Sequence, residues 1–303
     1  MKIGITGGTG FIGHHFIKAF VDKYSFSVIT SRKGNPIFDL YKCLTVHNLP
    51  YSVDGYCRAF QDCDAVVHLG AKVMHNWDGD LSVSKWIKNL ENDGYVFEAC
   101  GKLGIKNVVY ASSVAVYDNR KNEAMKEEMV DFPNSLYGLI KSAGERLAGI
   151  YNERYGMKIK CLRISKVIGF NGINHDDTSF WSQVLIRSIE KNPINIYGEG
   201  KTARDIIYVK DVAMAIDCAV NKPEISGIFN IGSGITATNL EIARAYCEIF
   251  DNEAGVHFVP DSSEPGLQNL LDCSKAAEIL AFKAKHNLYD MVADIKRDVL
   301  DVI

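Results

Sequence analysis

The chain has 303 residues, of which 47% are hydrophobic and 23% are charged, and its formal net charge at pH 7 is −3. The hydrophobic fraction is too high for a disordered chain, and the near-neutral charge gives no electrostatic footprint for nucleic acid or an anionic membrane. The two long uncharged stretches, Ile3–Ile17 and Ile225–Leu240, contain too much Gly, Thr, Ser, His and Asn to predict membrane spans.

The eight cysteines are scattered through the chain and form no CxxC pair. In a chain of this size the pattern favours reduced thiols over a disulfide framework, and it predicts no metal site. Gly4, Gly7 and Gly8 interrupt any signal-peptide core near the N-terminus. We therefore expect a cytoplasmic protein.

Short apolar runs alternate with amphipathic stretches over the first 165 residues, which is the pattern of a parallel sheet covered by helices. The expected strands are Lys2–Thr6, Phe26–Thr30, Asp64–Leu69, Asn107–Ser112 and Lys158–Ser165. The expected helices are Phe11–Val21, about Leu81–Leu103 and Ser135–Tyr155.

After Lys166 the pattern changes, beginning with a loop rich in Gly, Asn and Asp at Phe170–Thr178. The later helices are expected at Phe180–Lys191, Asp211–Val220 and Asn239–Phe250, with strands at Asn195–Tyr197, Gly227–Ile231 and Val256–Val259, and two short helices at the end. We predict an α/β fold with a Rossmann-type doubly wound parallel sheet and a smaller mixed α/β C-terminal substrate lobe. The cofactor domain is expected to span 1–165, with returning segments near 205–235, and the lobe to comprise 166–204 and 236–303.

A glycine-rich segment, TGGTGFIG at Thr6–Gly13, joins the first strand to the first helix. Glycines at positions 7, 10 and 13 allow a tight turn, close approach of a pyrophosphate and close packing of helix on strand. The helix N-terminus adds N–H donors. This position favours dinucleotide binding over a glycine-rich turn without a ligand.

The end of the second strand selects the cofactor in dinucleotide-binding folds. Here Ser31, Arg32 and Lys33 follow the strand, and no carboxylate occurs before Asp39. A hydroxyl and two cations suit the 2′-phosphate of NADP, whereas NAD binders usually place a carboxylate there. We therefore predict NADP, with NAD as the alternative if Arg32 and Lys33 are ordinary solvated charges.

Tyr137 and Lys141 lie four residues apart on a predicted helix, so both side chains project from one face. The lysine charge favours the phenolate form of the tyrosine and makes it a usable acid–base group. Ser112 and Ser113 end a predicted strand, where ligand crevices of α/β sheets lie. A hydroxyl there can hold a substrate hydroxyl or carbonyl while Tyr137 moves its proton.

Together these segments make the chain resemble the extended short-chain dehydrogenase/reductases of the nucleotide-sugar epimerase/dehydratase type over nearly its whole length. The motifs that carry the resemblance are TGGTGFIG (Thr6–Gly13), HLGA (His68–Ala71), SSVAVY (Ser112–Tyr117), YGLIK (Tyr137–Lys141), LRISKVIG (Leu162–Gly169), YGEGKTARDIIYVKDVA (Tyr197–Ala213) and FNIGSG (Phe229–Gly234).

The resemblance implies roles for individual residues. Ser113 matches the catalytic hydroxyl, Tyr137 the acid–base group, and Lys141 the residue that holds the nicotinamide ribose. Arg204 matches an arginine used against the substrate diphosphate, and Asp211 is expected to cap the following helix. The implied cofactor-binding residues, besides Tyr137, Lys141, Ser31, Arg32 and Lys33, are Gly7, Gly10, Phe11, Ile12, Gly13, Asn48, Leu69, Gly70 and Ala71.

Three departures from the family pattern bear on the reaction and substrate. Val114 and Ala115 replace the Asp-Glu pair of the dehydratases, and neither can transfer a proton, so 4,6-dehydration is disfavoured. Lys166 replaces an asparagine that usually touches substrate, and it either meets a phosphate or carboxylate or faces outward. The usual second diphosphate-binding arginine is missing before Asp272–Ala276, so either another cation such as Lys166 or Lys201 takes its place or the substrate is not a nucleotide diphosphate.

The leading hypothesis is an NAD(P)-dependent oxidoreductase or epimerase acting at C4 of a nucleotide-activated sugar. Because Arg32 favours NADPH, a 4-keto-reductase is slightly preferred to a 4-epimerase. The alternatives are an NADP-dependent dehydrogenase or reductase of a non-nucleotide alcohol or sugar acid, and a non-catalytic NADP(H)-sensing regulator. The resemblance is also compatible with a homodimer built through the helix that carries Tyr137.

Overall fold

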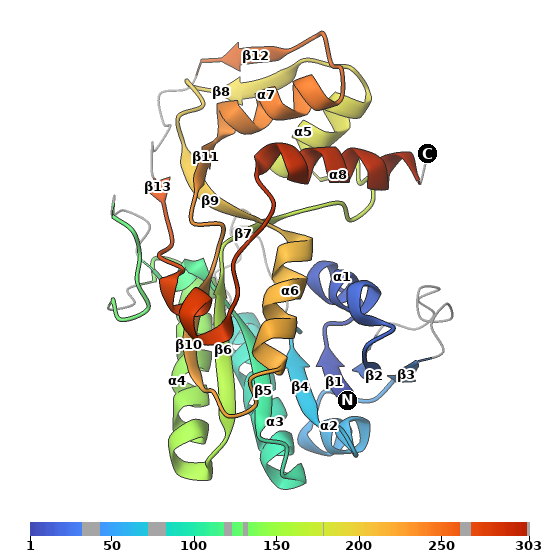
Figure 1. Ribbon diagram of the computed structural model, residues 1–303, viewed down its shortest axis with the longest axis vertical. Helices are drawn as coiled ribbons and strands as arrows, with labels where there is room; N and C mark the ends of the chain where they lie inside the picture. The colour runs from blue at the N-terminus through green and yellow to red at the C-terminus, as the bar shows by residue number, and fades with distance from the viewer. Residues whose placement is uncertain are drawn as a thin grey trace.

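The computed structural model describes residues 1–31, 43–71, 83–117, 123–129, 133–177, 179–260 and 268–301. A seven-stranded sheet forms the larger part of the molecule (Figure 1), and all its neighbouring strands run parallel in the order β10-β6-β5-β4-β1-β2-β3. Its strands are β1 (Lys2–Thr6), β2 (Ser25–Ile29), β3 (Leu44–His47), β4 (Ala65–His68), β5 (Asn107–Ser113), β6 (Lys158–Ile164) and β10 (Gly227–Ile231).

Helices cover both faces of this sheet. One face carries α1 (Phe11–Phe20) and α6 (Val209–Val220), whose buried side chains pack with Ile3, Ile5 and Val28 of the strands. The other face carries α2 (Val53–Phe60), α3 (Val83–Leu103) and α4 (Leu136–Tyr155), which pack with neighbouring apolar residues of β4 and β5. Strands buried on both faces need apolar residues throughout, which explains their nearly continuous runs of Val and Ile.

The smaller lobe stands over the carboxyl ends of these strands (Figure 1). Its four-stranded sheet is mixed, because β9 pairs parallel with β7 and β13 and antiparallel with β11. These strands are β7 (Lys166–Ile168), β9 (Ala203–Tyr208), β11 (Thr236–Thr238) and β13 (Gln268–Asn269), and a separate pair joins β8 (Ile194–Tyr197) to β12 (Val256–Val259). The lobe's helices are α5 (Phe180–Ile189), α7 (Asn239–Ile249) and α8 (Leu288–Leu300).

The predicted α/β fold is confirmed, and each predicted strand and helix overlaps one in the structure. Six strands and α-helices were not predicted, namely α2, β3, β7, β9, β11 and β13. The helix expected from Asp211 begins at Val209, because β9 runs directly into α6 without a turn residue. The last helix, α8, has 13 residues and is longer than the short helix expected there. All eight cysteines are free thiols.

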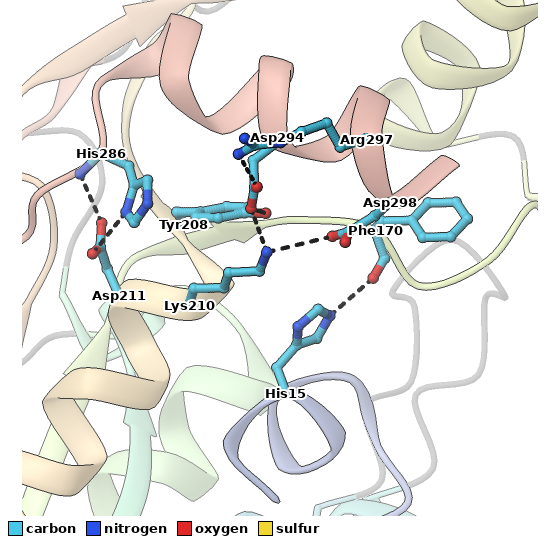
Figure 2. A network of polar contacts seen from close by, with 9 residues as sticks. All are labelled: His15, Phe170, Tyr208, Lys210, Asp211, His286, Asp294, Arg297 and Asp298. Atoms are coloured by element: carbon cyan, nitrogen blue, oxygen red, sulfur yellow. Dashed lines mark hydrogen bonds and ion pairs between the residues drawn. The ribbon is translucent and has the colours of Figure 1, made fainter. Parts of the chain in front are cut away.

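Polar contacts tie the smaller lobe to the helices beneath it (Figure 2). The Asp294 carboxylate on α8 accepts hydrogen bonds from the hydroxyl of Tyr208 and the ammonium of Lys210, at the junction of β9 and α6. Below Lys210 in the view, the ring of His15 on α1 lies 2.9 Å from the carbonyl oxygen of Phe170. Among the described residues, the helices are all too short or too polar to cross a bilayer.

Candidate active site

The predicted site residues converge because parallel strands end at one edge of their sheet. β1 and β4 are neighbours there, although more than fifty residues separate them in the chain, and this is the switch point at which α/β sheets bind ligands. Five predicted positions follow or end successive strands at this edge, namely Gly7 after β1, Ser31 after β2, Asn48 after β3, Leu69 after β4 and Ser113 at the end of β5.

The glycine turn leaves no room for side chains. Gly7 has a φ of +71°, and a Cβ there would lie 2.8 Å from the backbone nitrogen of Gly70. A Cβ on Gly13 would lie 2.3 Å from the carbonyl oxygen of Gly7. Gly10 caps α1 without a side chain, so the helix's first N–H groups have no side-chain acceptor. Such a cradle fits the pyrophosphate of a dinucleotide.

The loop after β4 is held against this turn by Thr6. The Thr6 hydroxyl oxygen accepts a 2.9 Å hydrogen bond from the Gly70 N–H, and the Thr6 carbonyl accepts one of 3.2 Å from Leu69. Leu69, Gly70 and Ala71 are half-buried beside the glycine turn. The structure therefore brings the two predicted cofactor segments together.

The cofactor-selecting positions are described only in part. Ser31 is exposed, and its N–H donates to the hydroxyl of Tyr51 at 3.0 Å. Asn48 is also exposed, directly after β3. Arg32 and Lys33, on which the NADP prediction depends, lie outside the described residues.

Ser113 and Tyr137 lie on segments that touch. The Ser113 hydroxyl accepts a 3.2 Å bond from the Ala115 N–H and caps the short turn that follows β5. Tyr137 lies in the first turn of α4, next to Gly138. A Cβ on Gly138 would lie 2.0 Å from the Ala115 carbonyl oxygen, so the helix start packs directly on the turn that carries Ser113.

Lys141, one turn further along α4, is 4% exposed. Its ammonium donates to the carbonyl oxygen of Ala111 at 2.7 Å and to the hydroxyl of Tyr110 at 3.4 Å. Trp86 of α3 packs beside the Tyr137 ring, with the ring centroids 6.0 Å apart. The structure therefore holds the predicted pair on one face of the helix.

The neighbouring Ser112 is turned into the protein interior. It is 4% exposed and donates to the Glu145 carboxylate, which also forms a 2.7 Å ion pair with the buried Arg163. Ser112 is therefore committed to this buried network, whereas Ser113 remains half-buried at the sheet edge.

In the smaller lobe, Lys166 and Arg204 lie near one aromatic ring. The Lys166 ammonium lies 5.2 Å from the centroid of Trp181, and the Arg204 guanidinium carbon lies 6.0 Å from it. Desolvation lowers the pKa of both cations. The Arg204 charge lowers the pKa of Lys166 further, and the Asp177 charge opposes this shift. Among the described residues neither cation has a carboxylate within ion-pair distance, and two cations clustered in this way favour an anionic ligand.

Asp211 plays a part that differs from the sequence analysis. It does not cap α6, whose N-cap is Tyr208; its carboxylate instead accepts from the ring nitrogen and backbone N–H of His286 at 2.9 and 3.1 Å (Figure 2). These bonds join the loop ahead of α8 to α6, and no local sequence pattern indicates them. The Trp181 ring packs against the apolar core of the lobe and also lies near both cations.

The chain is similar to known proteins in sequence and in fold. A family model described as NAD dependent epimerase/dehydratase family matches residues 3–232. A putative UDP-glucose 4-epimerase of Methanocaldococcus jannaschii is 30% identical, over 76% of this chain and 76% of that protein. UDP-N-acetylglucosamine 4-epimerase from Bacillus cereus is 27% identical with a TM-score of 0.87, covering 99% of this chain and 96% of that one. UDP-glucuronic acid 4-epimerase from Bacillus cereus, solved with UDP-glucuronic acid and NAD, is 25% identical with a TM-score of 0.86 and full coverage of both chains.

Proposed function

Because the chain belongs to the NAD-dependent epimerase/dehydratase family, we propose that it is an epimerase that inverts C4 of a nucleotide-activated sugar, with a UDP-sugar as the expected substrate. The single observation that carries the proposal is the contact between the turn bearing Ser113 and the helix start bearing Tyr137. This contact lies at the same sheet edge as the glycine cradle. The names of the similar proteins, which are UDP-sugar 4-epimerases, support the substrate class.

The cofactor would lie across the carboxyl edge of the large sheet. Gly7, Gly10 and Gly13, with the backbone of Phe11 and Ile12, would hold its pyrophosphate, and Leu69–Ala71 would lie beside it. A nicotinamide dinucleotide, when bound, supplies reversible hydride acceptance and donation. The run Ser31-Arg32-Lys33 favours NADP, whereas the solved UDP-glucuronic acid 4-epimerase from Bacillus cereus contains NAD.

The chain's own residues orient the sugar and move its proton. The Ser113 hydroxyl holds the substrate C4 oxygen while the Tyr137 hydroxyl oxygen takes the proton from that oxygen and later returns it. The Lys141 ammonium would hold the nicotinamide ribose. Val114 and Ala115 offer no further acid or base beside Ser113, which is consistent with epimerisation rather than 4,6-dehydration.

The smaller lobe would hold the nucleotide diphosphate. Arg204 and Lys166 supply the positive charge, so that Lys166 takes the part of the missing second arginine. The proposal assigns residues 1–165, with returning segments near 205–235, to the cofactor, and 166–204 with 236–303 to the substrate. It also keeps the expectations of a cytoplasmic enzyme and of a homodimer through α3 and α4, where Val83, Ile87 and Leu139 are exposed.

A 4-keto-reductase is the second candidate, and the cation run at Ser31–Lys33 is the observation that favours it. The two are separated by incubating the purified protein with UDP-glucose, UDP-N-acetylglucosamine and UDP-glucuronic acid without added cofactor and following the sugar signals by NMR. An epimerase converts at least one of them to its C4 epimer, while the matched Tyr137→Phe protein does not. Conversion of a 4-keto sugar that consumes one NADPH per turnover would instead establish the reductase.

A further inference from the structure

The Lys141 ammonium is held in the interior of the large domain, where a positive charge needs a counter-charge. Besides Asp93 of α3 and Tyr110 of β5, the charged and titratable groups around this ammonium come from α4 itself, from β4 and from β6. They are Tyr137 and Glu145 of α4, His68 of β4, and Cys161 and Arg163 of β6. Glu145 is neutralised by Arg163, with their closest atoms 2.7 Å apart. The remaining carboxylate near Lys141, among the described residues, is Asp93 of α3.

Asp93 is 1% exposed and reaches Lys141 through one hydroxyl group. The Tyr110 hydroxyl donates to the Asp93 carboxylate at 2.7 Å, and its oxygen accepts from the Lys141 ammonium at 3.4 Å. No more than about 6 Å therefore separates the ammonium nitrogen from the carboxylate oxygen. The ammonium also lies 4.6 Å from the centroid of the Tyr110 ring. At such distances opposite charges stabilise each other's ionised forms.

The other Asp93 oxygen ends a second chain of hydrogen bonds, which starts at the cofactor cradle. Nε2 of His68 lies 2.8 Å from the Asp93 carboxylate, which can only accept a hydrogen bond, so the proton of the neutral ring lies on Nε2. Nδ1 of His68 then accepts from the Thr6 hydroxyl, 2.6 Å away, and the oxygen of that hydroxyl accepts from the Gly70 N–H. Burial opposes ionisation of Asp93, but the His68 bond and the Lys141 charge outweigh it and hold the pKa of this carboxyl below its ordinary value.

The fold makes room for this arrangement at Gly144 of α4. A Cβ there would lie 2.4 Å from the Tyr110 hydroxyl oxygen and 2.8 Å from the Asp93 carboxylate. The helix that carries Lys141 therefore passes close to both partners. Three elements, α3, β5 and α4, contribute to one buried polar unit on a single face of the sheet.

We propose that Asp93 is a positioning residue for Lys141, holding its ammonium in place through Tyr110 and linking it through His68 to the cofactor cradle. The inference rests on the proposed function only for what Lys141 does in the reaction. Its physical content is that the Lys141 ammonium, which keeps its 2.7 Å bond to the Ala111 carbonyl oxygen, is held less firmly when the Asp93 charge or the Tyr110 hydroxyl is removed. An amide cannot reproduce both bonds of the carboxylate. Its NH₂ group must face either the His68 N–H or the Tyr110 hydroxyl, and the group that it faces then loses its acceptor.

The test is NMR of the Lys141 side chain in the full-length protein with ¹⁵N-labelled lysine, the signal being assigned by its loss in Lys141→Arg. In the parent protein we expect a protected ammonium signal at pH 7 and low temperature. Asp93→Asn should speed exchange of the ammonium protons at least about tenfold, and Tyr110→Phe should do the same. Glu98→Gln is the matched control, since it removes an exposed carboxylate of the same helix that pairs with Lys102; it should leave the Lys141 signal unchanged.

Unchanged ammonium exchange in folded Asp93→Asn, even with a lower melting temperature, would overturn the proposal. If Asp93→Asn does not fold, unchanged exchange in Tyr110→Phe overturns it. The NMR test uses neither substrate nor cofactor, so it separates this inference from a failure of the proposed epimerase activity.

Discussion

Replacing Arg204 with methionine is expected to stabilise the free protein and to weaken its binding of a nucleotide. The Arg204 guanidinium is partly buried beside a second cation, Lys166, and no carboxylate among the described residues forms an ion pair with it. Removing an unpaired charge of this kind should raise the free energy of unfolding of the free protein, by about 1 kcal/mol. If Arg204 binds the diphosphate of a nucleotide, the same change should weaken nucleotide binding.

The loss of affinity follows from the interaction removed. A hydrogen bond to a charged group contributes about 1.5–3 kcal/mol, so UDP should bind about 10- to 100-fold more weakly. At saturating UDP this removes about 1.4–2.7 kcal/mol of ligand-induced stabilisation. For a chain of this length the UDP-induced rise in melting temperature should shrink by about 2–4 °C.

The assay is thermal unfolding with and without UDP at a fixed concentration. Lys201→Met is the matched control, because Lys201 is an exposed lysine close in sequence that pairs with Glu199. The melting temperature of this variant should match that of the parent protein both without UDP and with UDP. An Arg204→Met protein whose UDP-induced shift equals that of the parent would refute the assignment of this side chain to the nucleotide site.

Three further changes test the catalytic and structural parts of the account. Tyr137→Phe should lower kcat at least about 100-fold while cofactor affinity, measured by fluorescence titration, stays within about twofold; retained turnover would remove Tyr137 from the mechanism. Glu145→Gln leaves the buried Arg163 charge uncompensated and should lower the free energy of unfolding, measured in urea, by about 3–5 kcal/mol. The control Glu98→Gln should lower it by less than about 0.5 kcal/mol, and equal losses in the two variants would contradict the buried ion pair. Lys210, Tyr208 and Arg297 hold the pKa of Asp294 at about 2 against the opposing effect of burial, so its stabilisation is present above pH 4 and is lost as pH falls through about 2. Asp294→Asn should therefore lower the free energy of unfolding by about 1–2 kcal/mol at pH 7. If the difference from the parent protein did not narrow between pH 4 and pH 2, ionisation of Asp294 would not be the source of this stabilisation.

Although α2 and β3 were missed, most regular elements of the large domain could be predicted because their apolar patterns are strong. β9 could not, since Arg204 and Asp205 interrupt its apolar run and it continues into α6 without a turn. The fold there depends on tertiary contacts. The buried Asp205 carboxylate accepts backbone N–H groups of Ser233 and Gly234 at 2.8 and 3.0 Å, bonds between segments nearly thirty residues apart.

The candidate site was predictable where its residues stand in local motifs, as do the glycine turn, Ser113 and the Tyr137–Lys141 pair. The buried chain from Thr6 to Lys141 was not, because its members come from five separate strands and helices. One signal was present in the sequence. Asp93 lies in the same helical stripe as Val96 and Cys100, and an acidic residue in a buried stripe requires a polar partner.

The central claim is epimerisation at C4 with the hydride returned to the same sugar. The most direct test mixes two samples of one UDP-sugar, one with deuterium at C4 and the other with a ¹³C-labelled ring and no deuterium. No cofactor is added, and the product is analysed by mass spectrometry. The account predicts that deuterium stays at C4 of the molecules that carried it, with none transferred to the ¹³C-labelled sugar. Dependence of conversion on added NADPH, with its hydride appearing at C4, would contradict the account.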